Sequence, residues 1–269
     1  MTTQTVWPDR TITDDLSRLR DVNPLVHCVT NLVVTNFTAN ALLAIGASPA
    51  MVVAAEEVAD FAPVANALLI NVGTVTSADV DAMLGAARAA RDAGTPWVLD
   101  PVAVGALGFR TGVVERLLEY DPTIIRGNAS EILALAGEAS GSKGADSTAD
   151  SADAIDGAQL LAARTGAVVA VTGVVDYVTD GHEVVGIPGG HELLTKVTGA
   201  GCALGAVLAA FAGVSASPFQ AAVSGSAVYA LAGERAARVA VGPGSLAVAL
   251  LDSLFLIGTE HDELLGRRT

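Results

Sequence analysis

Short apolar runs alternate with longer amphipathic segments along most of this chain, and this alternation constrains the fold more than any other feature. Strands are predicted at 25–29, 50–53, 67–72, 97–99, 123–125 and 168–171. Helices are predicted at 31–45, 56–65, 77–93, 113–120 and 129–136, and most of 199–257 is predicted to be helical. Segments 177–179 and 183–187 are typical of a hairpin. Because helices follow strands, the sequence predicts an α/β fold with a central, mostly parallel sheet flanked by helices on both faces.

Residues 1–269 are predicted to form a single domain. Segment 138–153 is polar and rich in small residues, which is typical of a flexible surface loop. The alternation of strands and helices resumes after it, so it does not mark a domain boundary. Hydrophobic residues make up 51% of the chain and charged residues 16%. A charged fraction this low also agrees with burial of surface between copies of the chain.

The formal net charge of −14 argues against a nucleic-acid partner, which would need a basic stripe. An anionic ligand such as ATP is still compatible, because a helix N-terminus, a metal ion or one lysine can supply local positive potential. No apolar run is long enough to span a membrane, and no signal peptide is evident. The two cysteines form neither a disulfide framework nor a zinc motif. We therefore expect a cytoplasmic protein without a membrane partner.

Parallel sheets bind ligands beyond the carboxyl ends of their strands. The residues that directly follow predicted strands are Thr30, Gly73, Asp100, Arg126 and Thr172. The site is expected among them.

The string TGAGCALGA, residues 198–206, opens a long apolar helix. Its glycines let the backbone approach a ligand, and a helix start offers unpaired N–H groups, which suit a phosphoryl group in transfer. A glycine-rich turn that caps a buried helix explains the spacing equally well. A dinucleotide site is disfavoured, because no acidic residue lies between Lys196 and Glu234 to bind a ribose.

A late Gly-Ala-Gly followed by Asp or Cys at a helix start resembles the ribokinase-like kinases, and Cys at that position resembles the hydroxyethylthiazole kinase family. Further strings resemble the same family over nearly the whole chain. They are NPLVHCVTNLVVTNFTANALLAIGASPAM, EEVADFA, LINVGT, LDPVAVGA, IIRGNASEI and VTGVVDYVTDG. The family commonly has DPVGAGA where this chain has Ala103-Val104 in the middle, so we expect a local backbone adjustment there without loss of activity.

The resemblance implies a ribokinase-like fold and ATP-dependent phosphorylation of the primary hydroxyl of 4-methyl-5-(2-hydroxyethyl)thiazole, in thiamine biosynthesis or salvage. It also implies Mg²⁺ as cofactor and a homotrimer with its sites at subunit interfaces. Two alternatives are kept open. One is an ATP- or ADP-dependent NAD(P)H-hydrate dehydratase of the same superfamily, against which Cys202 counts because those enzymes normally have Asp there. The other is a non-catalytic nucleotide-binding assembly protein.

Catalytic roles implied by the resemblance fall on the glycine-rich string. Cys202 is predicted to accept the proton of the substrate hydroxyl, with its thiol pKa lowered by the helix N-terminus. Gly199 and Gly201 are predicted to form the anion hole around the transferred group. A small buried helix residue is the structural alternative for Cys202, whereas Cys28 is predicted to be a core residue.

Binding roles are also carried over from the family. Arg126, Thr172 and Thr198 are predicted to bind ATP. Asp100 and Glu131 are predicted to organise Mg²⁺, although Glu131 also fits a helix capping box with Asn128.

On the substrate side, Asn31, Met51 and Gly199 are predicted to contact the thiazole alcohol. A core methionine is the structural alternative for Met51, and His27 is predicted to be a core histidine. The other histidines, His182, His191 and His261, are assigned no role.

Overall fold

The computed structural model describes residues 2–4, 9–137 and 150–258. Its strands are β1 (Thr2–Gln4), β2 (Leu25–Val29), β3 (Ser48–Ala50), β4 (Ala67–Asn71), β5 (Trp97–Asp100), β6 (Ile124–Asn128), β7 (Val168–Thr172), β8 (Val175–Thr179) and β9 (Val184–Pro188). Its α-helices are α1 (Arg10–Val22), α2 (Thr35–Ile45), α3 (Ala55–Phe61), α4 (Val80–Ala93), α5 (Gly108–Leu118), α6 (Ala129–Ala136), α7 (Ile155–Thr165), α8 (Ala200–Ala212), α9 (Pro218–Val239) and α10 (Pro243–Leu256). Short 3₁₀ helices are η1 (Ala62–Val64), η2 (Ser151–Ala154) and η3 (Glu192–Lys196).

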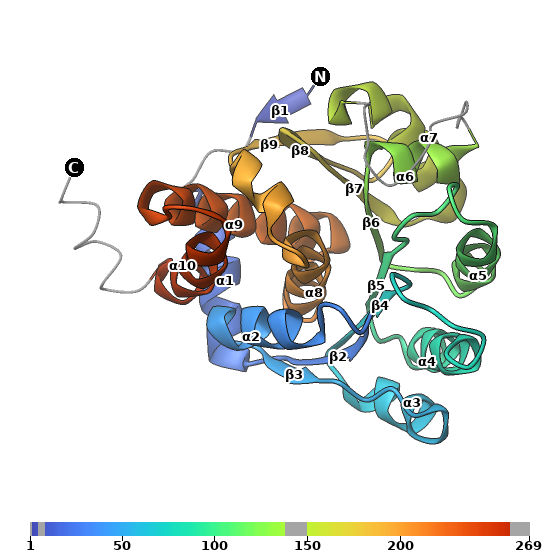
Figure 1. The fold of residues 1–269 in the computed structure, drawn as a ribbon. Coiled ribbons are helices and arrows are strands. Elements are labelled where there is room, and N and C mark those ends of the chain that lie inside the picture. The colour runs from blue at the N-terminus through green and yellow to red at the C-terminus, as the bar shows by residue number, and fades with distance from the viewer. Residues whose placement is uncertain (1, 5–8, 138–149, 259–269) are drawn as a thin grey trace.

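The described strands form one nine-stranded sheet in the order β1-β9-β8-β7-β6-β5-β4-β2-β3 (Figure 1). All pairs from β3 to β7 are parallel, and β8 pairs antiparallel with β7 and β9. The last residues of neighbouring strands lie opposite each other, with Asn71 beside Asp100 and Asn128 beside Thr172. The predicted, mostly parallel sheet is confirmed, and its carboxyl ends share one edge.

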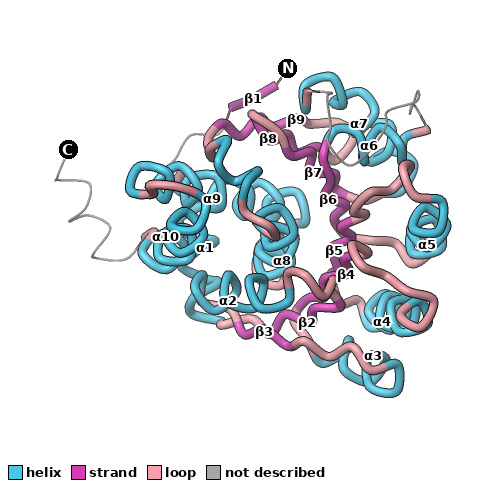
Figure 2. Tube along the Cα trace, viewed as in Figure 1, coloured by secondary structure: helices cyan, strands magenta, loops and turns pink. Residues whose placement is uncertain are grey.

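Helices cover both faces of the sheet, as predicted (Figure 2). Helices α1, α2, α8, α9 and α10 lie on one face, and α3 to α7 lie on the other (Figure 1). Strand residues alternate between the two apolar cores: Leu69 packs with the first group, whereas Leu68 and Ile70 pack with the second. Because both faces are buried, the strands read as continuous apolar runs, which is typical of parallel sheets.

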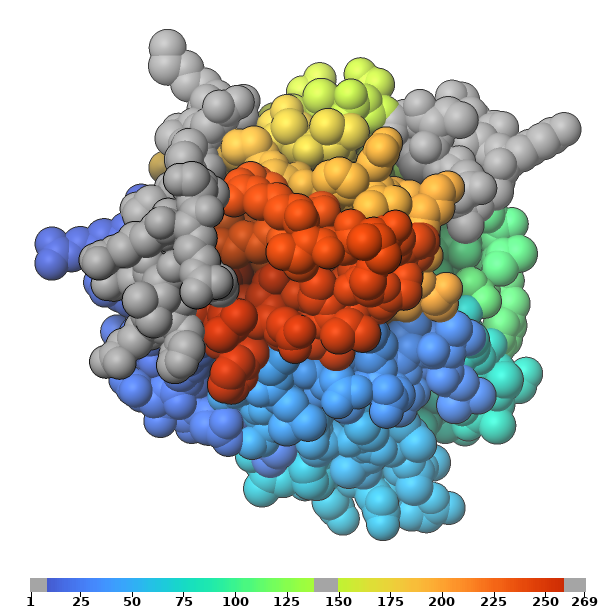
Figure 3. All heavy atoms as spheres, turned by 60° about the vertical axis from the view of Figure 1, so that its left-hand side comes forward, coloured from blue at the N-terminus to red at the C-terminus, as the bar shows by residue number. Residues whose placement is uncertain are grey.

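The first and last helices of the chain share one layer. Helix α10 contacts both α9 and α2, and α1 packs against α9. Figure 3 shows these C-terminal segments, in red, directly against N-terminal segments, in blue. Helix α8 is apolar all round because it lies between this layer and strands β4 and β5.

Three predicted helix starts are wrong. The helix predicted from residue 113 begins five residues earlier, at Gly108, and the other two begin three or four residues late. The helix predicted from residue 31 begins at Thr35, because the Asn31 Oδ1 accepts a hydrogen bond from Val33 N at 3.1 Å and holds a turn. The helix predicted from Ser77 begins at Val80, because the Asp79 carboxylate accepts from the N–H and the hydroxyl of Thr76. Side chains that bond the nearby backbone delay both helices.

Two strand boundaries also differ from the prediction. The strand expected at 50–53 is β3, which ends at Ala50, and the strand expected to end at residue 125 continues to Asn128. Arg126 therefore lies inside β6, opposite Ala170 of β7, rather than after it. Helices α1 and α7 are not among the predicted elements.

Most of the predicted loop, residues 138–149, lies outside the described residues, as does His261. Within the part of the chain that is described, no helix has the length and hydropathy needed to cross a membrane.

Candidate active site

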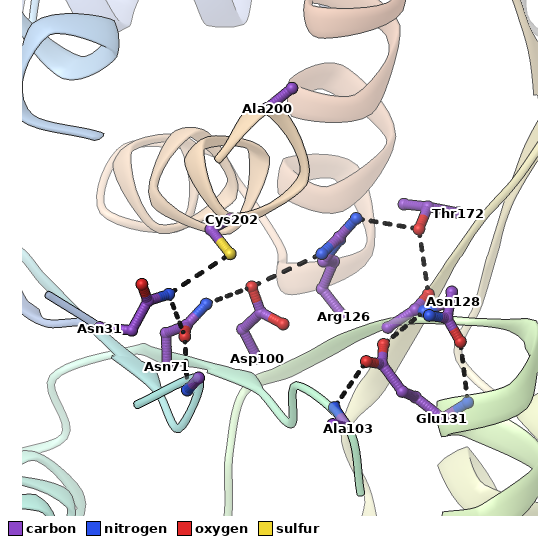
Figure 4. A network of polar contacts seen from close by, with 12 residues as sticks. Asn31, Asn71, Asp100, Ala103, Arg126, Asn128, Glu131, Thr172, Ala200 and Cys202 are labelled. Carbon is purple, nitrogen blue, oxygen red and sulfur yellow. Dashed lines mark hydrogen bonds and ion pairs between the residues drawn. The ribbon is translucent and has the colours of Figure 1, made fainter. Parts of the chain in front are cut away.

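Polar side chains from four strands and from the loop that follows β2 meet the start of α8 at the carboxyl edge of the sheet (Figure 4). A continuous chain of hydrogen bonds and one ion pair joins them. Its members, in order, are Cys202, Asn31, Asn71, Asp100, Arg126 and Thr172. The structure thus brings together most of the residues that the sequence predicted for the site, and it adds Asn71.

The start of α8 depends on two glycines. Gly199 precedes the helix with φ of 90°, and a Cβ there would lie 2.8 Å from Val34 Cγ1. A Cβ on Gly201 would lie 3.0 Å from Nη2 of Arg126, so the guanidinium lies against the first turn of the helix. The Tyr229 hydroxyl holds the same turn by donating to the Ala200 carbonyl at 2.6 Å. The first turn of α8 and the guanidinium of Arg126 therefore lie side by side, and the space next to both suits an anion.

Cys202 is partly buried in the first turn of α8, and Asn31 Nδ2 donates to its Sγ at 3.5 Å. Burial raises the pKa of the Cys202 thiol, and the Asp100 charge raises it further, whereas Arg126 lowers it. The expectation of a lowered thiol pKa is therefore wrong. Desolvation outweighs the nearby cation, so the sulfur stays protonated at neutral pH.

Asp100 ends β5, and its side chain is 0% exposed. Its Oδ2 accepts from Asn71 Nδ2 at 2.7 Å and lies 3.5 Å from Arg126 Nη1, whereas its Oδ1 has no partner within the described residues. Burial raises the pKa of Asp100 to about 7, against a lowering by Arg126. The protein alone therefore does not fully stabilise the charged carboxylate, which has one oxygen left for a ligand.

Arg126 and Thr172 bond each other across β6 and β7. Arg126 Nη2 donates to Thr172 Oγ1 at 2.9 Å, and this hydroxyl donates to the Gly127 carbonyl at 3.3 Å. Arg126 is buried, and its Nε has no partner among the residues described here. A buried guanidinium with an unused N–H is suited to bind phosphate oxygens.

Glu131 opens α6 and holds two loops. Its Oε2 accepts from Asn128 N at 2.9 Å, while the Asn128 side chain accepts from Glu131 N, so the predicted capping box is confirmed. Its Oε1 accepts from Ala103 N at 2.8 Å. Both carboxylate oxygens therefore already bind backbone N–H groups.

Ala103 has φ of 62°, in the left-handed region that glycine favours. Its N–H is held there by Glu131. The expected backbone adjustment at Ala103-Val104 thus leaves an alanine in a conformation typical of glycine. The strain lies in the turn that directly follows Asp100 and Pro101.

Replacing Ala103 with valine is expected to lower the free energy of unfolding by about 2 kcal/mol, because a β-branched residue fits poorly at positive φ. Ala103→Gly is the control. It should change stability by less than about 1 kcal/mol, because relief of strain offsets the entropy that glycine gains in the unfolded chain. Urea denaturation of the three proteins measures both values. Equal stability of Ala103→Val and wild type would contradict the strained turn.

The other predicted residues lie around this network. Met51 follows β3 and is partly buried against the core, so the alternative role of a core methionine also fits. Thr198 is exposed beside Gly199. The core assignments are confirmed: Cys28 is fully buried, and the Nε2 of buried His27 bonds the Val52 carbonyl at 2.8 Å.

Asn71 and Tyr229 are site residues that the sequence reasoning missed. The polar Asn71 interrupts the apolar run of residues 67–72, and this was the available signal. Tyr229 lies in a long helical stretch and carries no local signal of its contact with α8.

Comparisons with known proteins agree with this geometry. The hydroxyethylthiazole kinase family matches residues 16–260. A hydroxyethylthiazole kinase of Leptospira interrogans serogroup Icterohaemorrhagiae serovar Lai is 59% identical over 255 residues, which cover 95% of this chain and 96% of the relative.

Solved structures show the same fold. Hydroxyethylthiazole kinase from Pyrococcus horikoshii OT3 superimposes with a TM-score of 0.85 at 40% identity, covering 93% of this chain and 94% of that one. A ribokinase-like superfamily protein from Enterococcus faecalis V583 has a TM-score of 0.64 at 13% identity, covering 94% of this chain and 91% of that one, and so supports the fold alone. The predicted ribokinase-like fold is confirmed, and the chain belongs to the hydroxyethylthiazole kinase family.

Proposed function

We propose that this phosphotransferase moves the γ-phosphoryl group of ATP to the primary hydroxyl of 4-methyl-5-(2-hydroxyethyl)thiazole, as a step of thiamine biosynthesis or salvage. The observation that carries the proposal is the meeting of Arg126, Asp100 and Cys202 at the start of α8. Family membership supports the thiazole alcohol as acceptor. Phosphoryl transfer depends mainly on positioning and on charge stabilisation, and this edge of the sheet supplies both.

The first turn of α8 receives the transferred group in this proposal. Gly201 and Cys202 lie in the first turn of α8, where backbone N–H groups have no partner within the helix and the helix start favours negative charge. Gly201 is exposed at this end, so the backbone is accessible to a phosphate. Thr198 and Gly199 border the same position, and Arg126 supplies the fixed positive charge.

Arg126 and Thr172 bind the nucleotide phosphates in this proposal. Their mutual hydrogen bond fixes the guanidinium plane, and the unused Nε leaves a donor for a phosphate oxygen.

The buried carboxylate of Asp100 fits a hydrated Mg²⁺. Its Oδ1 is buried without a partner, and a divalent cation would favour the ionised form that burial disfavours. Mg²⁺ keeps several of its waters and binds phosphate oxygens, so a single carboxylate of the protein is enough to place it. When bound, the ion would neutralise phosphate charge. Glu131 would act indirectly, by fixing the backbone N–H groups of Ala103 and Asn128 near the site of the ion.

The thiazole alcohol is proposed to lie between Asn31, Met51 and Gly199. Cys202 lies beside the amide of Asn31 and would accept the hydroxyl proton. Only the thiolate can accept that proton, so the thiol proton would first leave Cys202 to solvent or to a phosphate oxygen. The loose transition state of phosphoryl transfer keeps the hydroxyl proton on the alcohol until late in the step. A polarisable methionine sulfur suits contact with a sulfur heterocycle.

We also propose a homotrimer with thiazole sites at its interfaces, and a single domain over residues 1–269. Leu32 and Val33, next to Asn31, are 83% and 65% exposed, so the substrate side of the site carries an uncovered apolar surface. A second subunit would cover it. The two free cysteines, Cys28 and Cys202, support the expected reducing, cytoplasmic setting.

A substrate screen tests the proposed function. Purified protein with ATP and Mg²⁺ is assayed for ADP release with the thiazole alcohol, with hydrated NADH, and with no acceptor. We expect release well above background only with the thiazole alcohol, together with formation of its phosphate. Turnover of hydrated NADH alone would favour the dehydratase, and ADP release at background in every arm would favour a non-catalytic protein.

A further inference from the structure

Asn71 is the last residue of β4, and its side chain is 0% exposed. Its Oδ1 accepts from Asn31 Nδ2 at 2.8 Å and from Gly73 N at 2.9 Å. Its Nδ2 donates to Asp100 Oδ2 at 2.7 Å. One amide thus joins the acceptor side of the site to the carboxylate on β5 (Figure 4).

The neighbours fix which way this amide points. The Asn31 Oδ1 accepts from Val33 N, so the Asn31 amide must present its Nδ2 to Asn71 and to Cys202. Asn71 therefore presents Oδ1 toward Asn31, and its Nδ2 toward the carboxylate. Donors follow acceptors in one direction from Val33 to Asp100, and a flipped amide would oppose donor to donor at Asn31.

The Asp100 carboxylate is oriented by this hydrogen bond. Asn71 and Arg126 both approach Oδ2, which leaves Oδ1 buried and without a partner in the described chain. The same amide holds Asn31 with its N–H on the sulfur of Cys202. A single side chain thus determines which carboxylate oxygen is open and where the acceptor-side amide lies.

We propose that Asn71 is a positioning residue of the phosphoryl transfer, which orients the Asp100 carboxylate and the Asn31–Cys202 pair through one buried amide. The inference rests on the proposed function, because it assigns Asn71 to the same reaction. It does not require Asn71 to touch either substrate.

Asparagine alone satisfies all three hydrogen bonds at this position. Aspartate has the same shape but no N–H, so Asn71→Asp would set one carboxylate against another at the place where Asp100 accepts now. Glutamine is longer by one methylene, and the space around Asn71 is closely packed. A Cβ added to the neighbouring Gly73 would lie only 2.7 Å from Asn31 Nδ2. The close packing explains why a small change at Asn71 should be felt at two reacting groups.

The test uses the full chain with Asn71→Asp, with Asp100→Asn, and with both substitutions together. Urea denaturation without ligands measures the hydrogen bond itself: Asn71→Asp should lower the urea midpoint, and the double substitution should recover at least half of the loss, because donor and acceptor then exchange places. Asn66→Asp is the matched control. Asn66 is exposed at the opposite end of β4, where its Oδ1 accepts from Leu25 N, and its substitution should leave both midpoint and kcat unchanged.

Steady-state kinetics test the role in the reaction. Asn71→Asp should lower kcat about 100-fold, because misplacement of reacting groups by about 1 Å has effects of this size, while KM for ATP stays within about threefold of wild type. The double substitution should be at least as slow as Asn71→Asp, since it has no carboxylate at position 100 and its new carboxylate lies on β4. If Asn71→Asp does not fold, Asn71→Ala carries the same kinetic measurement.

Two outcomes in the variants overturn the inference while leaving the proposed function intact. Wild-type kcat in Asn71→Asp, or in Asn71→Ala if that variant is used, would show that the amide does not position the reacting groups. Recovery of kcat together with stability in the double substitution would reduce Asn71 to a structural role. A wild-type protein that is inactive on the thiazole alcohol would overturn the proposed function, and the inference with it. The urea midpoints of the variants do not test the proposed function.

Discussion

Replacing Asp100 with asparagine is expected to lower kcat by about a thousandfold while the protein remains folded. The amide has the shape of the carboxylate but lacks the negative charge that would hold Mg²⁺ beside the phosphates. Stability should change little, because burial raises the pKa of Asp100 to about 7 and so already favours a neutral group at this position.

Coupled measurement of ADP release at saturating ATP, Mg²⁺ and thiazole alcohol gives kcat, and urea denaturation gives stability. The control is Asp15→Asn. Asp15 is also buried, but it accepts from Ser224 on α9, away from the carboxyl edge of the sheet, so its substitution should leave kcat unchanged. An Asp100→Asn protein with more than about a tenth of wild-type kcat would contradict the role of this carboxylate.

Replacing Cys202 with alanine is expected to lower kcat about 100-fold, the usual contribution of a positioned proton acceptor. Cys202→Asp should match or exceed wild type, because a carboxylate is a suitable proton acceptor and Asn31 Nδ2 is placed to donate to it. Turnover of the three proteins at saturating substrates measures the effect. The order Asp, then Cys, then Ala is the expected result.

Cys28→Ala is the matched control for Cys202. Cys28 is fully buried in β2, where burial raises its pKa to about 12, so it is an inert core thiol. Its removal should lower stability by about 1 kcal/mol and leave kcat unchanged. Wild-type turnover in Cys202→Ala would remove the proton-acceptor role, although the kinase assignment would stand.

The sheet and the edge that carries the site could be predicted from the sequence, because apolar runs mark buried strands and ligands bind where those strands end. Asp100 and Thr172 follow such runs and lie at this edge. Cys202 follows a glycine-rich turn and lies in the first turn of α8. The location of each of these residues can be predicted from its neighbours in the sequence, because strand ends and helix starts are marked by local patterns.

The remaining features depend on contacts between segments far apart in the chain. Asn71 gains its role only because Asn31 and Asp100 flank it in space, and Tyr229 reaches Ala200 from another helix. The sequence predicts the wrong direction for the pKa shift of the Cys202 thiol, because a helix start is visible in the sequence whereas desolvation depends on what packs around the sulfur. The positive φ of Ala103 likewise follows from its bond to Glu131.

The central claim is that the start of α8 binds the transferred phosphoryl group beside Cys202. A crystal structure with a non-hydrolysable ATP analogue, Mg²⁺ and the thiazole alcohol tests it most directly. We expect the terminal phosphate within hydrogen-bond distance of backbone N–H groups of residues 199–202, with the alcohol oxygen between that phosphate and the sulfur of Cys202. A terminal phosphate directed away from this turn, with the alcohol bound elsewhere, would contradict the account.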